Sequence, residues 1–328
     1  MINNNKILSV KDLHIEFVHR KGNLNAIRGV SFDMYKGEIL GVVGESGAGK
    51  SLTGSAITGL LEFPGRIKSG EITLNDRRID NLTESERRKI RGIEIAAIFQ
   101  DPLTSLNPVL TIEEQLVETI QTHLPLSYED AYQRALTLLQ DVGIPAPEER
   151  LKQFPHQFSG GMRQRIVIAL ALCVEPSVII ADEPTTALDV SVQSQVLSLL
   201  KRLCKQHGTS VMLITHDMGV VAETCDRVAV MYAGELIELG DVKDVIHKPQ
   251  HPYTIGLMDS IPKIGQKIEK LSQISGSMPR LNQLPDGCKF NPRCPQKSAK
   301  CTQQSPVLTK AGRSYMACFL ANERIKEL

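Results

Sequence analysis

A glycine-rich segment that follows a short apolar run constrains this chain more than any other feature. Residues 44–51 match the pattern G-x-x-x-x-G-K-[ST], and the apolar run Ile39-Leu-Gly-Val-Val43 directly precedes them. Loop amides and the N-terminus of a following helix surround phosphate anions in such a segment. The pattern therefore predicts a strand, a phosphate-binding loop and a helix in succession. The alternative is a glycine-rich turn with a solvated lysine.

Two side chains of this loop have separate expected roles. Lys50 is expected to neutralise phosphate charge, and Ser51 is expected to bind Mg²⁺. A magnesium-bound nucleotide is therefore the predicted ligand. The residues predicted to line it are Gly44, Glu45, Ser46, Gly47, Ala48, Gly49, Lys50, Ser51 and Leu52.

Apolar strands that alternate with amphipathic helices predict a parallel, helix-covered sheet. Antiparallel β structure is expected before the loop, over residues 8–17 and 29–34. Residues 111–154 carry helical patterns without a strand, which indicates a helical subdomain inserted into the sheet. The other predicted elements are strands 95–99, 178–181 and 211–215, helices 112–123, 128–142, 161–174 and 191–206, and a hairpin over 227–240 that turns at Ala233-Gly234.

Two carboxylates follow the apolar run 178–181. Phosphoryl transfer to water needs one acid that orients Mg²⁺ and a neighbour that polarises the attacking water. Asp182 fits the metal role and Glu183 the general base. Taken alone, two acids at a strand end more often cap a turn, but after a phosphate loop they favour catalysis.

The segment Phe158-Ser-Gly-Gly-Met-Arg-Gln-Arg165 resembles the signature of the ABC ATPases, usually written LSGGQ. Phe158 and Met162 stand at its first and last positions, and Met162 replaces the common glutamine. A serine and two glycines that open a helix make an anion-binding terminus, although in isolation they indicate an ordinary serine cap. The residues expected to contact nucleotide through this terminus are Ser159, Gly160 and Gly161.

Other residues match the ABC pattern in order along the chain. Gln100 resembles the Q-loop glutamine, Ala187-Leu-Asp189 the D-loop, and His216 the switch histidine that contacts the γ-phosphate. Phe17 is a candidate for stacking on adenine, with core packing as the alternative. The resemblance implies catalytic roles for Lys50, Gln100, Glu183 and His216, Mg²⁺ ligation by Ser51, Gln100 and Asp182, and a nucleotide contact by Asp189.

The resemblance covers about residues 8–240 and implies an α/β fold, that of a P-loop NTPase of the ABC type. We expect a mostly parallel central sheet, an N-terminal antiparallel β subdomain, an inserted helical subdomain at about 105–175 and a small C-terminal extension. The expected domains are a nucleotide-binding domain, 1–250, and the extension, 251–328. The resemblance further implies an ATPase that works as a head-to-tail dimer, with ATP between the loop of one subunit and the signature of the other.

Two C-terminal motifs resemble the oligopeptide and dipeptide permease branch of this family. They are His251-Pro-Tyr-Thr254 and the cysteine-containing segment that starts at Gly287. The branch implies an importer of peptides, or of nickel, glutathione or antimicrobial peptides. Its implied partners are a second, non-identical ATPase subunit, two transmembrane permease subunits and an extracytoplasmic solute-binding protein, with this chain peripheral at the cytoplasmic face of the cell membrane.

Four of the seven cysteines lie in a segment too poor in apolar residues to fold alone without a staple. Their spacing, C-x5-C-x6-C-x16-C, lacks the C-x2-C pairs of structural zinc sites, and the branch resemblance implies a [4Fe–4S] cluster. Zinc and unligated thiols are the alternatives. The four are Cys288, Cys294, Cys301 and Cys318, whereas Cys173, Cys204 and Cys225 are expected to be small buried apolar residues.

Charge and composition weigh against other classes of protein. Lys and Arg total 38 against 37 Asp and Glu, so no global field attracts nucleic acid. We therefore expect no nucleic-acid partner, which disfavours a soluble ABC protein that remodels ribosomes or DNA. A pseudo-ATPase scaffold is disfavoured because the lysine, acids and histidine named above are all present. We also expect no secretory signal and no membrane span, since no run approaches about 20 apolar residues.

Overall fold

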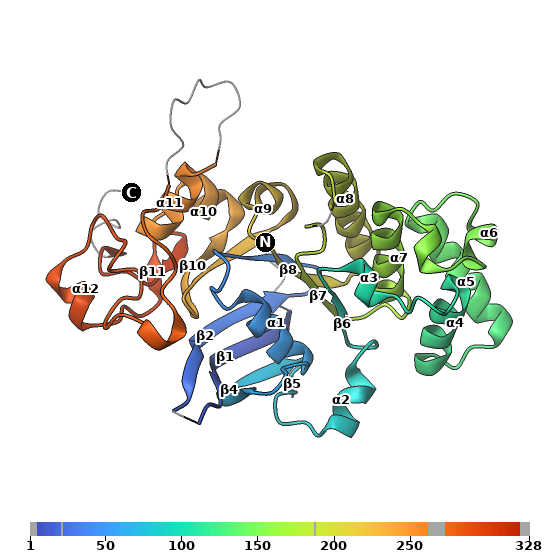
Figure 1. Ribbon diagram of the computed structural model, residues 1–328, viewed down its shortest axis with the longest axis horizontal. Coiled ribbons are helices and arrows are strands. Elements are labelled where there is room, and N and C mark those ends of the chain that lie inside the picture. Colours follow the sequence, from blue (N-terminus) through green and yellow to red (C-terminus); the bar gives the residue numbers. More distant parts are fainter. Residues whose placement is uncertain (1–4, 21, 187, 262–272, 322–328) are drawn as a thin grey trace. The chain divides into compact units, whose positions relative to one another are not determined.

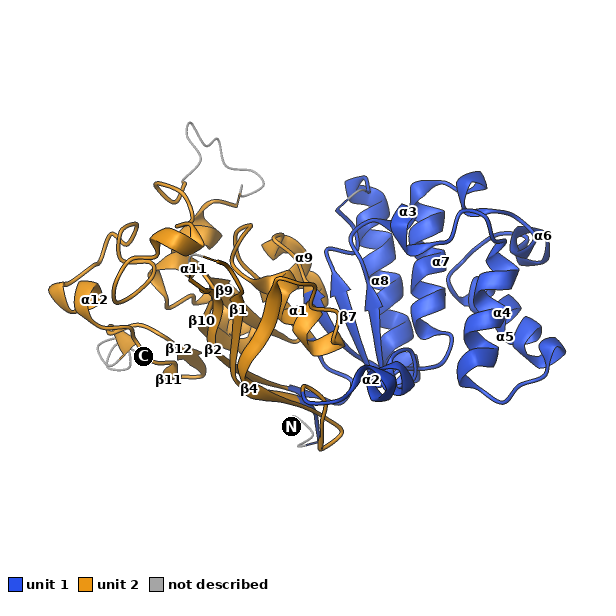
Figure 2. Cartoon of the chain, turned by 60° about the horizontal axis from the view of Figure 1, so that its bottom comes forward, with its two compact units in different colours: residues 1–8, 34–39, 81–213 blue, residues 9–33, 40–80, 214–328 orange. Residues whose placement is uncertain are grey.

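The computed structural model describes residues 5–20, 22–186, 188–261 and 273–321. They form two compact units, shown in Figure 2. Unit 1 comprises residues 1–8, 34–39 and 81–213, and unit 2 comprises residues 9–33, 40–80 and 214–328, within the described parts of these ranges. Ala187 and part of the segment after Ile261 lie outside the described residues.

A four-stranded sheet in the order β2-β1-β4-β5 contains the N-terminal strands. Its apolar side chains are largely buried, as Leu8, Leu13 and Ile15 of β1 show. The predicted antiparallel N-terminal β structure is confirmed. The strand bounds are β1 (Lys6–Phe17), β2 (Leu24–Tyr35), β4 (Gly65–Leu74) and β5 (Arg77–Arg78).

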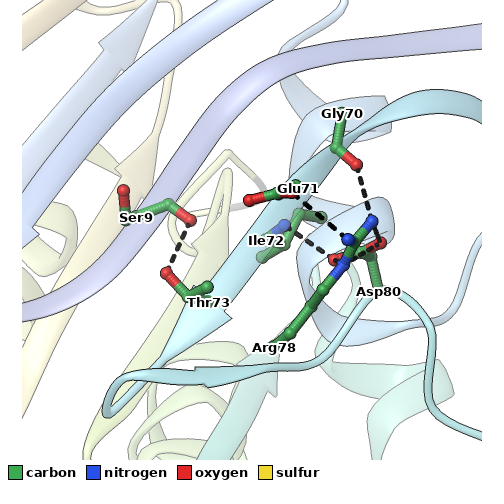
Figure 3. Close-up of polar contacts among 7 residues, drawn as sticks. All are labelled: Ser9, Gly70, Glu71, Ile72, Thr73, Arg78 and Asp80. Atoms are coloured by element: carbon green, nitrogen blue, oxygen red, sulfur yellow. Dashed lines mark hydrogen bonds and ion pairs between the residues drawn. The ribbon is translucent and has the colours of Figure 1, made fainter.

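The hairpin of β4 and β5 is closed by the carboxylate of Asp80 (Figure 3). Asp80 accepts a hydrogen bond from the backbone N–H of Ile72 at 2.8 Å and one from Arg78 Nη2 at 2.9 Å. The hydroxyl of Thr73 donates to the carbonyl of Ser9 on β1 at 3.5 Å. The Asp80 bonds hold the hairpin together, and the Thr73 bond joins it to β1.

A second set of strands in unit 2 includes the fully buried β3 (Ile39–Val43). β3 pairs in parallel with β9 (Arg227–Tyr232), which pairs antiparallel with β10 (Glu235–Asp241) around the turn Ala233-Gly234. The predicted hairpin over 227–240 is thus confirmed.

The C-terminal extension joins this set of strands (Figure 1). β10 pairs antiparallel with β12 (Ser314–Met316), and β12 pairs antiparallel with β11 (Thr309–Ala311). A small buried cluster of Ala311, Met316 and Ala321 packs beside Cys318. The extension therefore gains by strand pairing some of the stability that its few apolar residues cannot supply. The helices of unit 2 are α1 (Lys50–Thr58), α9 (Met218–Thr224), α10 (Val242–His247), α11 (Pro252–Asp259) and α12 (Ala299–Gln303).

Unit 1 contains β6 (Ile95–Ile98), which pairs in parallel with β7 (Val178–Asp182), and β8 (Ser210–Ile214), the next strand in order. Residues 111–154 are all described, and they contain helices and no strand, as predicted. The helices of unit 1 are α2 (Glu84–Ile90), α3 (Pro102–Ser105), α4 (Ile112–His123), α5 (Tyr128–Asp141), α6 (Pro147–Leu151), α7 (Gly160–Leu172) and α8 (Val190–His207). Helix α7 contacts β6, α3, α4, α5 and α8.

The predicted boundaries shift by one or two residues where local hydrogen bonds decide them. Helix α7 begins at Gly160 rather than Gly161 because Ser159 caps it, and it ends two residues before the predicted Val174. Among the described residues, no helix is both long and apolar enough to span a bilayer.

Three cysteines are buried in the cores, as predicted: Cys173, Cys204 and Cys225. Burial raises the pKa of the Cys173 thiol and of the Cys204 thiol to about 12. Both thiols therefore stay protonated near neutral pH and act as small apolar groups.

Candidate functional site

The phosphate loop lies between β3 and α1, as the sequence predicts. Gly44, Gly47 and Gly49 all have positive φ, and α1 begins directly after the last of them, at Lys50. A Cβ on Gly44 would lie 2.3 Å from the carbonyl oxygen of Met231, so only glycine fits there. The loop conformation therefore depends on its glycines.

Lys50 is 5% exposed, and its ammonium group lies over the loop. Its Nζ donates to the carbonyl oxygens of Gly44 at 2.8 Å and Glu45 at 3.1 Å. An ammonium held in this way can neutralise phosphate charge. Ser51 follows it, exposed on the first turn of α1, and Leu52 is half-buried.

The turn between β9 and β10, which belongs to unit 2 as the loop does, contacts the loop. The N–H of Gly234 donates to the carbonyl of Ala48 at 2.8 Å, and the N–H of Arg28 donates to the carbonyl of Gly234 at 2.9 Å. A Cβ on Gly234 would lie 1.9 Å from the carbonyl oxygen of Ala26. The turn was predictable from the sequence, whereas its contact with the loop was not.

Glu45 is held by two residues that sequence analysis did not assign to the site. Its N–H donates to the hydroxyl of Tyr253 at 2.9 Å, and its carboxylate accepts from Arg293 at 3.0 and 3.1 Å. Tyr253 belongs to the His-Pro-Tyr-Thr motif, and Arg293 precedes Cys294 in the cysteine-containing segment. The two motifs mark Tyr253 and Arg293 as members of the extension, but nothing in either motif indicates a contact with Glu45.

Parallel pairing in unit 1 brings two predicted site residues together. Ile98 of β6 pairs with Ala181 of β7, so Gln100 and Glu183 follow the same ends of neighbouring strands. Gln100 Nε2 donates to Glu183 Oε2 at 3.3 Å. Asp182 is the half-buried last residue of β7.

Thr186 is a further contact of Glu183 that sequence analysis missed. The Thr186 hydroxyl donates to Glu183 Oε2 at 2.9 Å. Glu183 itself has φ 46, an uncommon conformation for a residue with a side chain. The turn after β7 and the threonine therefore hold the carboxylate in one orientation.

The signature segment forms an exposed, capped helix N-terminus. The Ser159 side chain accepts from the N–H of Met162 at 3.4 Å, and Ser159 and Gly160 are exposed. Phe158 is 3% exposed and lies under the guanidinium of Arg150, with 5.8 Å from ring centroid to carbon. The aromatic ring at this position therefore has a packing role.

The remaining predicted residues lie near element ends. Asp189 directly precedes α8, whereas Ala187 of the same motif is outside the described residues. His216 is exposed after β8, and Phe17 is half-buried at the end of β1. Their roles at the nucleotide stay predictions.

The four C-terminal cysteines line one cavity of about 290 Å³. Burial raises the pKa of the Cys288 thiol to about 11. Among the described residues, no three His, Cys, Asp or Glu side chains gather closely enough to hold a metal ion. The part of the chain that the structure describes therefore gives no support for the predicted iron–sulfur or zinc site beyond the shared cavity.

An α/β chain with a phosphate loop, a Gln–Glu pair and a capped Ser-Gly-Gly helix between the two members of that pair in sequence is a P-loop ATPase of the ABC class. The family model "ABC transporter" matches residues 27–186, and the model "Oligopeptide/dipeptide transporter, C-terminal region" matches residues 237–301. For an ABC ATPase the expected ligands are ATP and Mg²⁺.

Curated relatives match almost the whole chain. The dipeptide transport ATP-binding protein DppD of Bacillus subtilis is 49% identical, over 97% of this chain and 96% of its own length. The oligopeptide transport ATP-binding protein OppD of Escherichia coli is 45% identical, over 97% of this chain and 94% of its own length. The chain therefore belongs to the ABC family of dipeptide and oligopeptide transport ATP-binding proteins, as the sequence motifs predicted.

Solved structures agree with this assignment. The ATP-binding cassette MJ0796, in a dimeric post-hydrolysis state with ADP and Pi, is 28% identical, with a TM-score of 0.64 over 72% of this chain and 99% of its own. The cassette cbiO1 from Clostridium perfringens, part of the transporter complex cbiONQ, also matches with a TM-score of 0.64, at 28% identity over 77% of this chain and 96% of its own. The predicted fold class is confirmed, and ATP hydrolysis is the activity of this class.

Proposed function

We propose that this chain is the ATP-hydrolysing subunit of a multi-subunit importer that takes up dipeptides or oligopeptides across the cytoplasmic membrane. The observation that carries the proposal is identity of 49–50% over 97% of the chain to relatives named as dipeptide and oligopeptide transport ATP-binding proteins. The match to the C-terminal region of such transporters supports the same substrate class. The proposed domains are residues 1–250 for nucleotide binding, with a helical subdomain at about 105–175, and residues 251–328 for the extension.

The proposed chemistry distributes roles according to the family pattern. Lys50 neutralises the β- and γ-phosphates, and Ser51 supplies a hydroxyl to Mg²⁺. Asp182 supplies a carboxylate to Mg²⁺, Glu183 accepts a proton from the attacking water, and His216 contacts the γ-phosphate.

The role of Glu183 has local support. The hydrogen bonds of Glu183 to Gln100 and Thr186 support the water-polarising role because they orient its carboxylate. Gln100 is also assigned to Mg²⁺, and Phe17 is assigned to adenine.

The proposed partners follow from exposed groups and from the family. Ser159 and Gly160 present an anion-binding helix terminus to solvent, which suits a nucleotide held by another subunit. Gly161 and Asp189 belong to the same proposed face. The partner is a second, non-identical ATPase subunit. Two transmembrane permeases and an extracytoplasmic binding protein complete the importer, with this chain at the cytoplasmic face.

We also propose that the cysteine cavity takes a metal centre, with [4Fe–4S] favoured over zinc. All four thiols line the cavity, and all-cysteine ligation suits either centre. Ligation requires the thiolate, so a bound centre would displace the proton that burial keeps on Cys288. A bound centre would supply structural cross-linking or redox sensing, because all-cysteine ligation leaves no open catalytic position.

The catalytic assignment is tested by Glu183→Gln. Loss of the general base is expected to lower the hydrolysis rate by about 10²–10⁴-fold, while the dissociation constant for ATP changes little. Phosphate release by the assembled importer and titration with a fluorescent ATP analogue measure the two quantities. Glu118→Gln, an exposed change on α4, is the matched control. Near-normal hydrolysis by Glu183→Gln would refute the assignment.

The metal proposal is tested by composition rather than by activity. Protein purified without oxygen is expected to contain iron and acid-labile sulfide and to absorb visible light. Cys294→Ser should lose these properties, and Cys225→Ser, a buried cysteine outside the cavity, should keep them. Zinc without iron would support the alternative centre, and a preparation free of both metals would remove the proposal.

A further inference from the structure

The C-terminal extension reaches the phosphate loop within unit 2 through one ion pair and one hydrogen bond. Arg293 Nη1 lies 3.0 Å and 3.1 Å from the two carboxylate oxygens of Glu45, the second residue of the loop. The hydroxyl of Tyr253 accepts the backbone N–H of the same glutamate at 2.9 Å. The first peptide unit of the loop is therefore held from outside by the extension.

The guanidinium of Arg293 is fixed by several other contacts. Its side chain is 7% exposed. Its Nε donates to the carbonyl of Ser275 at 2.9 Å, and its Nη1 donates to the hydroxyl of Tyr232 at 3.3 Å. Burial by itself lowers the pKa of Arg293, but the hydrogen bonds to Tyr232 and Glu45 more than offset it and leave the pKa raised. The positive charge is thus permanent and immobile.

An aromatic cluster positions both contact residues. The rings of Tyr232, Tyr253 and Phe290 meet edge-on, with centroid distances of 4.7 to 5.5 Å. Burial and then the nearby Glu45 charge raise the pKa of Tyr253, so its hydroxyl stays protonated. His251 Nδ1 accepts the N–H of Tyr253 at 3.0 Å. Such edge-on packing restricts ring motion, so the tyrosine hydroxyl keeps its place at the loop.

The same cluster adjoins the cysteine cavity. Phe290 and His251 line that cavity, and Cys294, which follows Arg293 directly, lines it as well. Arg293 is therefore covalently joined to a residue that lines the cysteine cavity.

We propose that Arg293 and Tyr253 are positioning residues for the phosphate loop and that the extension thereby sets the affinity of the chain for ATP. Glu45 places a negative charge at the start of a loop that must bind a polyanion. Arg293 neutralises that charge, and Tyr253 fixes the backbone from which the carboxylate projects. The proposal rests on the ATP-binding role of the loop, and it gives the extension a function at the nucleotide that does not depend on a metal centre.

A double-mutant cycle on the full chain tests the charge. The probe is a fluorescent ATP analogue titrated in the presence of Mg²⁺. Arg293→Gln leaves Glu45 unpaired, so the dissociation constant should rise about tenfold at low salt, and less at high salt. Glu45→Gln leaves the arginine charge facing the phosphates, so affinity should stay equal or become tighter. In the double variant the charge is gone, and affinity should return to within about threefold of wild type.

Tyr253→Phe tests the backbone contact separately, because it keeps the ring in the aromatic cluster and removes only the hydroxyl. A rise of about threefold or more in the dissociation constant is expected, roughly the value of one hydrogen bond. This variant also serves if Arg293→Gln does not fold, as judged by circular dichroism. Arg313→Gln, an exposed arginine in the turn between β11 and β12, is the matched control and should bind like wild type.

The results distinguish a failure of ATP binding by the loop from a failure of the positioning role. Failure of wild-type protein to bind ATP refutes the ATP-binding role itself. Normal binding by wild type, with an unchanged dissociation constant for both Arg293→Gln and Tyr253→Phe, refutes only the positioning role. A double variant as weak as Arg293→Gln alone refutes charge neutralisation.

Discussion

Replacement of Gly234 by alanine is predicted to destabilise the protein strongly. Gly234 has φ +81, and an added Cβ would lie 1.9 Å from the backbone oxygen of Ala26. Backbone cannot move aside like the end of a flexible side chain. Gly234→Ala therefore combines the strain of a left-handed conformation, about 1–2 kcal/mol, with a steric displacement of about 1–3 kcal/mol. The expected loss of unfolding free energy is about 2–5 kcal/mol.

A matched glycine in the same unit separates the two contributions. Gly276 has φ +77, and the nearest atom to a Cβ there would be in the Arg293 side chain at 3.6 Å, an ordinary contact. Gly276→Ala is therefore expected to lose only the conformational part, about 1–2 kcal/mol. Urea denaturation of the two variants measures the difference. Equal losses for both variants would refute the steric reasoning.

The displacement also predicts a functional effect. The N–H of Gly234 donates to the carbonyl of Ala48 in the phosphate loop. Because a shifted turn takes this contact with it, Gly234→Ala should weaken ATP binding even where the protein is still folded. Titration at low temperature, with folding monitored by circular dichroism, measures this effect.

Two further predictions concern unit 1. The pKa of Cys204 is raised from 9.0 to about 12, so with rising pH the thiol ionises first in the unfolded chain. The contribution of the protonated thiol to the free energy of unfolding is therefore complete below about pH 9 and is lost between there and about pH 12. By pH 10 the loss is about 1.4 kcal/mol, and Cys204→Ala should lack it; parallel stability curves for the two proteins between pH 8 and pH 10 would contradict the assignment. Ser159→Ala and Ser127→Ala each remove a helix cap and should each lose about 1 kcal/mol in urea denaturation. Only Ser159→Ala should also slow hydrolysis in the assembled importer, and equal rates for both variants would argue against the proposed nucleotide contact.

The nucleotide motifs could be predicted because their chemistry depends on neighbours in sequence. A phosphate loop needs glycines, a lysine and a helix start within eight positions. Similarly, the buried strand that ends at Asp182 is followed directly by Glu183 in the sequence. Hydrophobic periodicity likewise predicted α4 at its observed bounds, Ile112–His123. The four cysteines were identified as a group by their spacing, and they line one cavity, but no metal-binding group is found there among the described residues.

Only the tertiary structure decided which distant residues meet the motifs. Arg293 and Glu45 are 248 positions apart, and no local preference favours their pairing. The contact exists because β12 pairs with β10 and because three aromatic rings pack together, which brings the extension to the loop. The sequence by itself determined the chemistry of phosphate binding, since the loop residues 44–51 are contiguous in the chain. The fold determined what holds the loop in place, since side-chain contacts between remote segments arise only when the chain has packed.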